Sequence, residues 1–301
     1  MSKKINILWS NANIGGAEIY VSRLNNLIKA ESVCLQGLKV SKFYEFLKTL
    51  FDKNNTFIFH DGRASIFSIL RFLFRKDYIV IHGPTKYPMF AKFFYFFLSY
   101  FVKKIVLVDK NLLGLQKINN VEYVKNESAL PFSLESYGND FVYIGRIEKS
   151  KRVDFLCDFW SKNNFKRKLR IIGSGSILEN LKKQYNTSSI IFHGARDQKD
   201  MKDILKNCRY YISMSKVEGV SLALQESLLI GLIPIVMDIP SQRYLYHKKL
   251  PLVSIDDSNL FEIIGLYCDK DEKQLDEISN FCKQFSKEIN NGAWEKFWLD
   301  V

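Results

Sequence analysis

Short apolar strands alternate with helical stretches along the whole chain, and this alternation constrains the fold more than any other feature of the sequence. Strands separated by helices are typical of parallel sheets that are covered by helices on both faces. In the first half, the predicted strands are 5–9, 33–36, 57–60, 78–82, 105–109 and 122–124. In the second half, they are 141–145, 168–172, 189–193, 210–213, 233–237 and 252–255. The sequence therefore predicts an α/β fold of two doubly wound, Rossmann-like units.

The two units are expected to meet where Pro131 and Gly138 interrupt the pattern. With 301 residues, 47% of them hydrophobic, the chain is long enough to form two domains with sizeable cores. We predict a first domain over 1–135, a second over 136–285, and a C-terminal helix over 286–301 that can cross back to the first. Because open parallel sheets bind ligands beyond the carboxyl ends of their strands, the ligand is expected between the units.

The tail of the chain is predicted to form one helix over 275–298, with Trp294, Phe297 and Trp298 on a shared apolar face. The apolar character of these three residues is explained equally well by packing within the second unit and by a crossing of the helix to the first unit.

Composition restricts the class of protein and its compartment. The five cysteines have no paired spacing, so they indicate neither a zinc site nor a disulfide framework, and we expect reduced thiols in the cytoplasm. Lys3 and Lys4 lead directly into a strand and then a polar run, so no secretory signal is expected. The formal net charge of +12 indicates an anionic partner.

The charge is concentrated in the segment 62–104, which contains eight Lys or Arg residues against one acid, together with nine Phe and four Tyr. Its helix over 89–102 is apolar nearly all round and too short to span a bilayer, so it is either buried or dipped into a lipid interface. Burial is favoured for one stripe: Phe90, Phe94, Phe97 and Phe101. Burial in the fold and contact with a lipid interface both remain open for three further residues: Phe93, Phe96 and Tyr100.

An anionic membrane surface therefore fits this segment, and we expect a peripheral protein on the inner face of the cytoplasmic membrane. Nucleic acid fits less well, because basic and aromatic residues do not alternate along predicted strands as a stacking platform requires.

Glu218 and Glu226 stand eight positions apart between two predicted strands. The helix that lies between these two strands opens at Ser221, contains Glu226 and ends at Gly231. Its start presents free backbone N–H groups, which form a ready anion site, and the Glu226 carboxylate can reach a sugar hydroxyl near a phosphate bound there. The expected ligand is a sugar phosphate or a nucleotide.

Two other strand-to-helix turns carry weaker signals. Gly15 and Gly16 allow a phosphate or sugar to approach the backbone, although paired glycines there are as often only a tight turn. Arg146 and Lys151 follow the strand 141–145, where they can neutralise a leaving diphosphate. By spacing alone, a solvated basic loop explains these cations better.

Gly173 and Gly175 form half of a dinucleotide fingerprint without its third glycine, so a nicotinamide cofactor fits poorly, and a nucleotide base or ribose is the expected neighbour. His60 and His82 each end a strand in the first unit. A lone histidine in such a place is more often structural than catalytic.

Taken in order, these segments resemble the retaining glycosyltransferases of the GT-B fold, family 4, which build bacterial lipopolysaccharide, O antigen and capsule. The resemblance covers essentially the whole chain and is strongest over 141–237. It rests on an ordered set of motifs: Gly15-Gly16-Ala17-Glu18, Gly145-Arg146 with Lys151, Gly173-x-Gly175, Gly194, Glu218-x7-Glu226 and Gly231-x-x-Pro234.

The resemblance implies roles for these residues. Arg146 and Lys151 would hold the donor diphosphate, Glu226 the ribose hydroxyls, and Glu218 would face the transferred sugar. His82 falls where the family places a histidine near the reacting sugar, and His60 aligns less surely. The donor nucleotide sugar would also meet four consecutive residues and five glycines: Gly219, Val220, Ser221, Leu222, Gly15, Gly16, Gly145, Gly173 and Gly175.

The chain departs from the family at two positions in the donor half, Ser221 and Arg152, where the family often has glycine. The donor sugar therefore stays open, with a UDP-sugar favoured over a GDP-sugar. A lipid-linked or oligosaccharide acceptor is expected, and the first unit is short for the family, which suits a lipid-linked acceptor presented at a membrane.

The implied activity is a retaining, metal-independent hexosyltransferase that takes a nucleotide sugar as substrate and needs no cofactor. Two alternatives remain: a non-catalytic partner in a polysaccharide-synthesis complex and a nicotinamide-dependent oxidoreductase.

Overall fold

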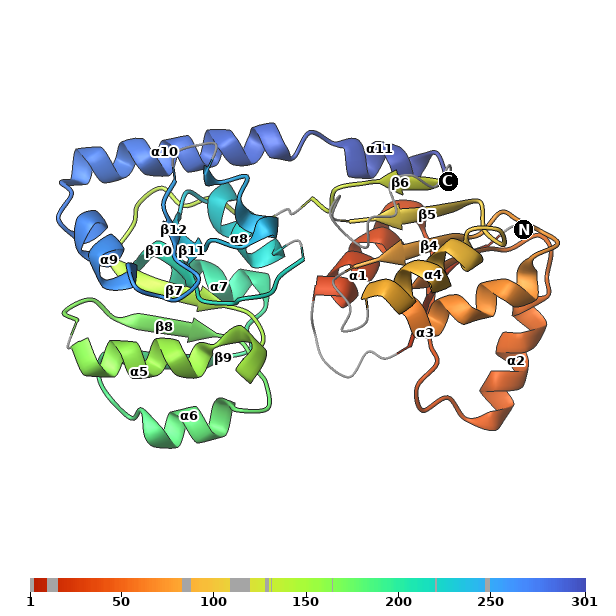
Figure 1. Cartoon of the computed structure of the whole chain (residues 1–301), viewed down its shortest axis with the longest axis horizontal. Coiled ribbons are helices and arrows are strands. Elements are labelled where there is room, and N and C mark those ends of the chain that lie inside the picture. The colour runs from red at the N-terminus through yellow and green to blue at the C-terminus, as the bar shows by residue number, and fades with distance from the viewer. Residues whose placement is uncertain are drawn as a thin grey trace. The chain divides into compact units, whose positions relative to one another are not determined.

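The chain forms two compact units, each with its own parallel sheet. The computed structural model describes residues 3–9, 16–82, 88–108, 120–127, 130, 132–163, 165–219, 221–246 and 250–301. Unit 1 comprises 1–126 and 292–301, and unit 2 comprises 127–291. Figure 1 shows the elements of each unit.

Unit 1 contains a six-stranded sheet in which every neighbouring pair is parallel, in the order β2-β1-β3-β4-β5-β6. Its strands are β1 (Lys4–Leu8), β2 (Glu31–Cys34), β3 (Thr56–His60), β4 (Tyr78–Ile81), β5 (Lys104–Leu107) and β6 (Val121–Tyr123). Its helices are α1 (Gly16–Ile28), α2 (Val40–Leu50), α3 (Asp61–Ser65), the 3-10 helix η1 (Ile66–Arg71), α4 (Pro88–Leu98) and α11 (Ala293–Leu299).

Unit 2 also contains a six-stranded parallel sheet, in the order β12-β11-β10-β7-β8-β9. Its strands are β7 (Asp140–Ile144), β8 (Leu169–Ile172), β9 (Ile190–Gly194), β10 (Cys208–Ser213), β11 (Ile233–Met237) and β12 (Leu252–Val253). Its helices are η2 (Lys149–Lys151), α5 (Val153–Asn163), α6 (Leu178–Gln184), α7 (Gln198–Leu205), α8 (Leu222–Leu229), η3 (Pro240–Gln242), α9 (Leu260–Cys268) and α10 (Glu272–Ile289).

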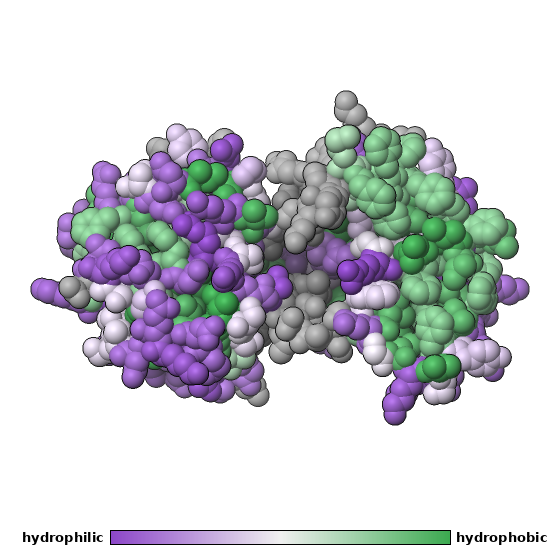
Figure 2. Space-filling model, turned by 60° about the horizontal axis from the view of Figure 1, so that its bottom comes forward, coloured by the Kyte–Doolittle hydropathy of each residue, from purple (hydrophilic) through white to green (hydrophobic). Residues whose placement is uncertain are grey.

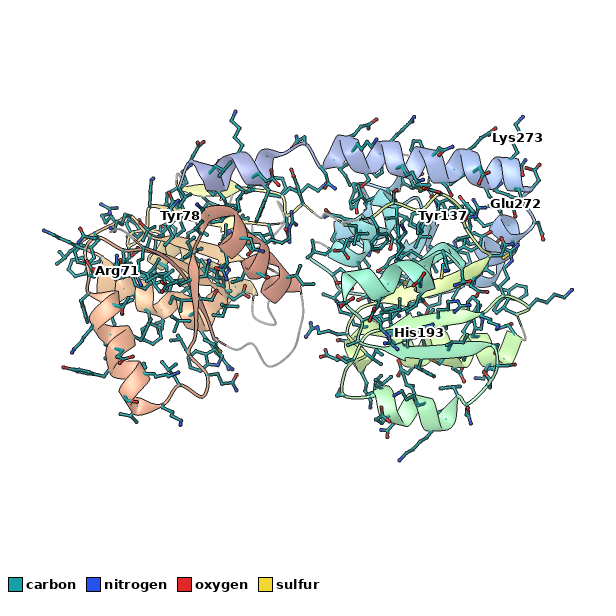
Figure 3. The ribbon with its side chains drawn as sticks, turned by 180° about the vertical axis from the view of Figure 1, so that it is seen from behind. Arg71, Tyr78, Tyr137, His193, Glu272 and Lys273 are labelled. Carbon is teal, nitrogen blue, oxygen red and sulfur yellow. The ribbon has the colours of Figure 1, made fainter. Side chains whose placement is uncertain are left out.

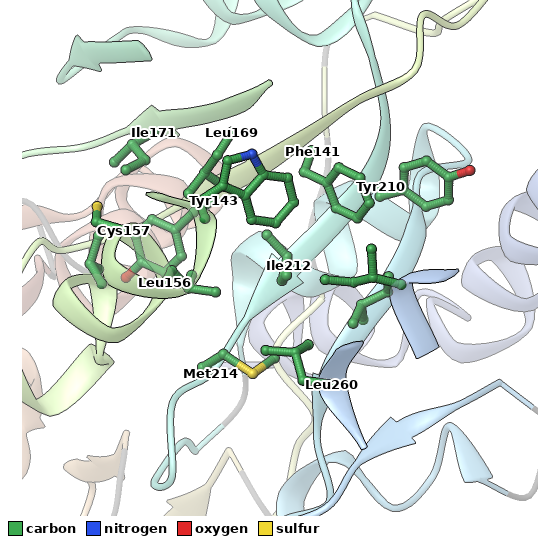
Figure 4. Packing of buried hydrophobic residues seen from close by; sticks show 14 of the residues in the cluster. Phe141, Tyr143, Leu156, Cys157, Leu169, Ile171, Tyr210, Ile212, Met214 and Leu260 are labelled. Carbon is green, nitrogen blue, oxygen red and sulfur yellow. The ribbon is translucent and has the colours of Figure 1, made fainter. Parts of the chain in front are cut away.

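The core of unit 2 lies on both faces of its sheet, because alternate residues of a strand point to opposite faces. Phe141 and Tyr210 belong to one buried cluster, shown in Figure 4, and their rings stack with centroids 4.5 Å apart. Val142 and Tyr211, the next residue along each strand, belong to the second cluster. Two buried faces require strands that are apolar throughout, and this is why the strands were visible in the sequence.

Each predicted strand is present within about two residues of its expected place, and the prediction of two doubly wound parallel-sheet units is confirmed. The topology also places a switch point in each sheet, where successive connections run in opposite directions. It falls between β1 and β3 in unit 1 and between β7 and β10 in unit 2. Ligands of such sheets bind at the carboxyl ends of the strands that flank the switch point.

The prediction of one continuous helix over 275–298 is wrong. The tail forms two helices, α10 and α11, separated by Asn290, Asn291 and Gly292, and the φ of 77° at Gly292 lies in the left-handed region that favours glycine. α11 packs against α1 within unit 1, and the Trp298 indole Nε1 donates a hydrogen bond to the Tyr20 hydroxyl at 2.8 Å.

The predicted buried stripe of the helix over 89–102 is also wrong. The structure buries Ala91, Tyr95 and Leu98, whereas Phe90 and Phe97 are exposed. A helix with aromatic residues on every side gives the sequence no signal for its inner face. A single alanine on the buried side marks where the helix packs inward.

Candidate functional site

The switch point of unit 2 gathers most of the predicted site residues. β7 and β10 are adjacent in the sheet, so the loops that follow them begin side by side at its carboxyl edge. The loop after β7 carries Arg146 and Lys151, and the loop after β10 carries Glu218. The helix that follows, α8, carries Glu226 in its second turn.

Lys151 and Glu218 form an ion pair that joins these two loops. Lys151 Nζ lies 2.7 Å from Glu218 Oε2, and the two side chains are only 17% and 15% exposed. The family resemblance implies a separate ligand for each residue, the donor diphosphate for Lys151 and the transferred sugar for Glu218. In the structure the two side chains pair with each other, so a phosphate that binds Lys151 would compete with the Glu218 carboxylate.

Two buried tyrosines support this corner of the sheet. Burial raises the pKa of Tyr211, and the negative charge of Glu218 adds to the rise. Burial likewise raises the pKa of Tyr143, with further contributions from Tyr211 and Glu218. Tyr143 therefore stays protonated and donates a hydrogen bond from its hydroxyl to the Arg146 carbonyl oxygen at 2.8 Å, which fixes the path of the loop.

The start of α8 has the features expected of an anion site. Ser221 is the N-cap, and its hydroxyl accepts a hydrogen bond from the Leu224 backbone N–H at 3.3 Å. The earlier N–H groups of the first turn have no partner within the helix. Gly219 lies two residues before the N-cap, and Val220, between them, lies outside the described residues. The Glu226 side chain is half-buried.

Arg146 occupies a different environment from Lys151. Its side chain is 46% exposed, and its closest ionic contact is Glu148, with Nη1 and Oε1 3.4 Å apart. An exposed guanidinium with one long ionic contact can turn toward an incoming anion at little cost.

The glycines after β7 and β8 hold their two loops against each other. A Cβ atom added to Gly173 would lie 1.8 Å from the Gly145 carbonyl oxygen, and one added to Gly175 would lie 2.3 Å from that of Ile147. Gly145 and Gly173 also have φ values of 152° and 148°, which side chains rarely permit. These glycines therefore set the backbone path that carries Arg146, and their contact with a nucleotide stays a prediction.

Arg152 adopts a backbone conformation that favours glycine. Its φ of 55° lies in the left-handed region. Its guanidinium makes two hydrogen bonds with the Asp257 carboxylate, at 2.8 and 2.5 Å, and covers the Phe155 ring at 4.3 Å. This pair ties the loop after β7 to the segment after β12. No sequence signal identified Asp257.

The switch point of unit 1 brings the two predicted histidines together. His60 ends β3, His82 follows β4, and His60 Nδ1 lies 2.8 Å from His82 Nε2. His60 Nε2 lies 2.8 Å from Asn6 Oδ1 on β1. Burial, followed by the charge of His82, lowers the pKa of His60 well below its usual range, so His60 is neutral at physiological pH.

Neutrality fixes the direction of this hydrogen-bond chain. Asn6 Nδ2 donates to Asn25 Oδ1 at 2.8 Å, which leaves Asn6 Oδ1 to accept from His60 Nε2. A neutral imidazole has one N–H, so His60 Nδ1 is the acceptor for His82 Nε2. The chain therefore places the proton of His82 on Nε2.

Other contacts hold His82 from two sides. The Asp61 carboxylate accepts a hydrogen bond from its backbone N–H at 3.0 Å, and the Tyr20 ring meets its imidazole edge-on with centroids 4.8 Å apart. The sequence did not indicate a role for Asn6, Asp61 or Tyr20, because each occupies an ordinary position in a strand, turn or helix. Gly15 lies outside the described residues, and Gly16 begins α1.

The part of the chain that the structure describes contains no group of three or more His, Cys, Asp or Glu side chains suited to a metal ion. None of its helices has the length and apolar character needed to span a bilayer.

A known family model matches part of the second unit. Residues 129–249 match the family model for glycosyl transferases group 1, which covers the switch point of unit 2 and α8. No curated protein matches the chain.

Several solved structures share the fold at low sequence identity. The Anabaena protein HepE in complex with UDP-glucose has 12% identity and a TM-score of 0.74, over 98% of this chain and 99% of that one. The lipopolysaccharide outer core galactosyltransferase WaaB has 16% identity and a TM-score of 0.63, over 98% and 100%. TarM has 16% identity and a TM-score of 0.68 over 85% of this chain, which spans only 56% of TarM. The two sheets thus have the architecture of GT-B glycosyltransferases.

Proposed function

We propose that the protein is a glycosyltransferase that moves a hexose from a nucleotide sugar to a saccharide or lipid-linked acceptor. One observation carries the proposal: the Lys151–Glu218 pair and the start of α8 lie at the switch point of the sheet that matches the group 1 glycosyltransferase model. Cations and a helix start at such an edge suit a diphosphate, and a carboxylate beside them suits sugar hydroxyls.

The donor that we favour is a UDP-sugar. HepE was solved with UDP-glucose and TarM with UDP, and both share the fold. A GDP-sugar remains the second candidate, since the residues that would meet the base are largely backbone.

The chemistry follows from where charge develops. As the glycosidic bond of the donor breaks, negative charge builds on the diphosphate. Arg146, Lys151 and the N–H groups at the start of α8 would stabilise that charge without a metal ion. Glu226 would bind the ribose hydroxyls and Glu218 the transferred sugar. Attack by the acceptor hydroxyl from the same face would retain the anomeric configuration, with no covalent intermediate.

Unit 1 would bind the acceptor, with His82 as its polar contact. The hydrogen bond with His60 fixes the orientation of the His82 ring, which suits a polar contact with a hydroxyl. A role in lipopolysaccharide, O-antigen or capsule synthesis on the inner face of the cytoplasmic membrane is consistent with WaaB as a structural neighbour.

The experiment is release of nucleoside diphosphate and transfer of sugar from a panel of UDP- and GDP-sugars to lipid-linked and free saccharides. Arg146→Ala and Glu226→Ala should abolish transfer while the unfolding transition stays unchanged. Lys273→Ala and Glu277→Ala, on the exposed side of α10, serve as matched controls that should keep full activity.

Unchanged turnover in both site variants would overturn the proposal. A protein that binds no donor would favour a non-catalytic partner of a polysaccharide-synthesis complex. Binding of NAD in place of a nucleoside diphosphate would favour the oxidoreductase.

A further inference from the structure

Unit 1 exposes a broad apolar surface built from η1, α4 and the residues that follow them. Figure 2 shows hydrophobic side chains gathered over this unit. Leu73 and Phe93 are 76% and 71% exposed, values that are high for such large apolar side chains. The η1–α4 face consists of Ile66, Leu70, Phe72, Leu73, Met89, Phe90, Phe93, Phe96, Phe97 and Tyr100.

The η1 half of this face is inverted relative to an ordinary surface helix. Its fully buried residues, Ser68 and Arg71, are polar, as is its buried N-cap Ser65, whereas Phe67 and Ile69 are only half-buried. Arg71 Nε lies 2.6 Å from the carboxylate of Asp77, and both side chains are fully buried. Polar residues inside and apolar residues outside reverse the arrangement that water favours.

The α4 half has an apolar inner side and an equally apolar outer side. Its inner contacts are made by Ala91, Tyr95 and Leu98, which leaves the larger phenylalanines outside. The two halves are continuous, because the Phe101 ring meets Phe72 at 6.4 Å on one side and Phe97 at 4.9 Å on the other. A contiguous apolar surface of this kind marks an interaction site.

The exposed charges of the segment that carries the face are of one sign, although Asp61, an exposed acid, directly precedes it. Among the described residues of 62–104, the exposed charged side chains are all basic: Arg63, Arg75, Lys92 and Lys103. The one acid of the segment, Asp77, is buried and paired. Unit 1 as a whole contains twenty Lys or Arg against ten Asp or Glu, a net +10, whereas unit 2 contains 24 against 22, a net +2.

We infer that the η1–α4 face binds the surface of an anionic lipid bilayer. Its phenylalanines and leucines enter the boundary between headgroups and acyl chains, and its cations meet the anionic headgroups. A second copy of the chain is a poor occupant, because a two-fold contact would place the same cationic rim against itself. The bilayer satisfies both the apolar centre and the cationic rim.

The experiment is sedimentation of the full chain with vesicles of phosphatidylcholine alone and of phosphatidylcholine mixed with phosphatidylglycerol. Phe93→Ser and Phe96→Ser should each lower partitioning into the mixed vesicles by roughly tenfold. Lys92→Glu should lower it by roughly fivefold or more. The matched controls lie on unit 2: Phe261→Ser, at a side chain 58% exposed, and the exposed Lys273→Glu.

Binding that requires phosphatidylglycerol, weakens in the three unit 1 variants and persists in both controls would support the inference. Absence of binding, or equal losses in the controls, would overturn it. A dimer in solution that dissociates on Phe93→Ser would overturn it in favour of a second copy. Sugar transfer to a water-soluble acceptor is measured separately, so either result leaves the proposed activity independently testable.

Discussion

Lys151 Nζ and Glu218 Oε2 lie 2.7 Å apart across the switch point of the second sheet, and each side chain is mostly screened from water by the fold. The pair links the loop after β7 to the loop after β10. Because the two residues are 67 positions apart in the sequence, no local pattern indicated that they meet.

The first prediction concerns the strength of this pair. Glu218→Gln and Lys151→Met should each destabilise the protein by roughly 1–3 kcal/mol, because each leaves the other charge partly buried without its partner. A double-mutant cycle by urea unfolding should give a coupling energy of about 0.5–3 kcal/mol. The exposed pair Lys162–Asp158 is the control and should show little coupling. Strict additivity of the Lys151 and Glu218 effects would show that the pair does not act as a unit.

The second prediction concerns Arg152. Arg152→Ala loses the contacts with Asp257 and keeps a side chain at a φ of 55°, whereas Arg152→Gly loses the same contacts and relieves the backbone. Thermal or urea unfolding should therefore rank wild type, Gly and then Ala in falling stability, with Ala below Gly by about 1 kcal/mol. An alanine variant as stable as the glycine variant would contradict this account of the position.

The third prediction concerns the return of the C-terminus to unit 1. Tyr20→Phe removes the acceptor of the Trp298 indole N–H in a fully buried place, so it should cost about 1–3 kcal/mol. Tyr100→Phe removes a hydroxyl from an exposed tyrosine and should change the free energy of unfolding by about 0.5 kcal/mol or less. Equal effects of the two variants would mean that the hydrogen bond contributes nothing.

The fourth prediction concerns the stability of the folded protein at acidic pH. Burial holds the pKa of His60 in the folded protein well below the 6.5 of an unfolded chain. As the pH falls below about 6.5, the unfolded state therefore binds a proton that the folded state does not, and stability is lost. The loss attributable to His60 should approach about 1.4 kcal/mol per pH unit. His60→Gln should flatten the pH profile by that amount, and a variant with the wild-type slope would contradict it.

The strands were predictable because sheets buried on both faces require continuous apolar runs, such as 78–82 and 233–237. The roles of aromatic residues were not. The sequence of α4 is apolar all round, so its inner face is decided by what it packs against. The outward face of η1 depends on Arg71 and Asp77, whose burial as a pair cannot be read from two ordinary charged residues.

The candidate site likewise contains residues that the sequence indicated and residues that it did not. Gly173, Glu218 and the start of α8 stood out because glycines at strand ends and a capped helix have local signatures. Asn6, Tyr20 and Asp257 did not, because each acts through a partner far along the chain.

Calorimetric titration of UDP, GDP and NAD into the full chain and into Glu226→Ala is the most direct test of the proposed activity. We expect one nucleoside diphosphate, most readily UDP, to bind the wild type and to bind the variant at least tenfold more weakly. This loss follows from removing hydrogen bonds between a charged group and the ribose hydroxyls. Glu277→Ala should bind like the wild type. Binding of neither UDP nor GDP to the wild type would contradict the proposed glycosyltransferase activity.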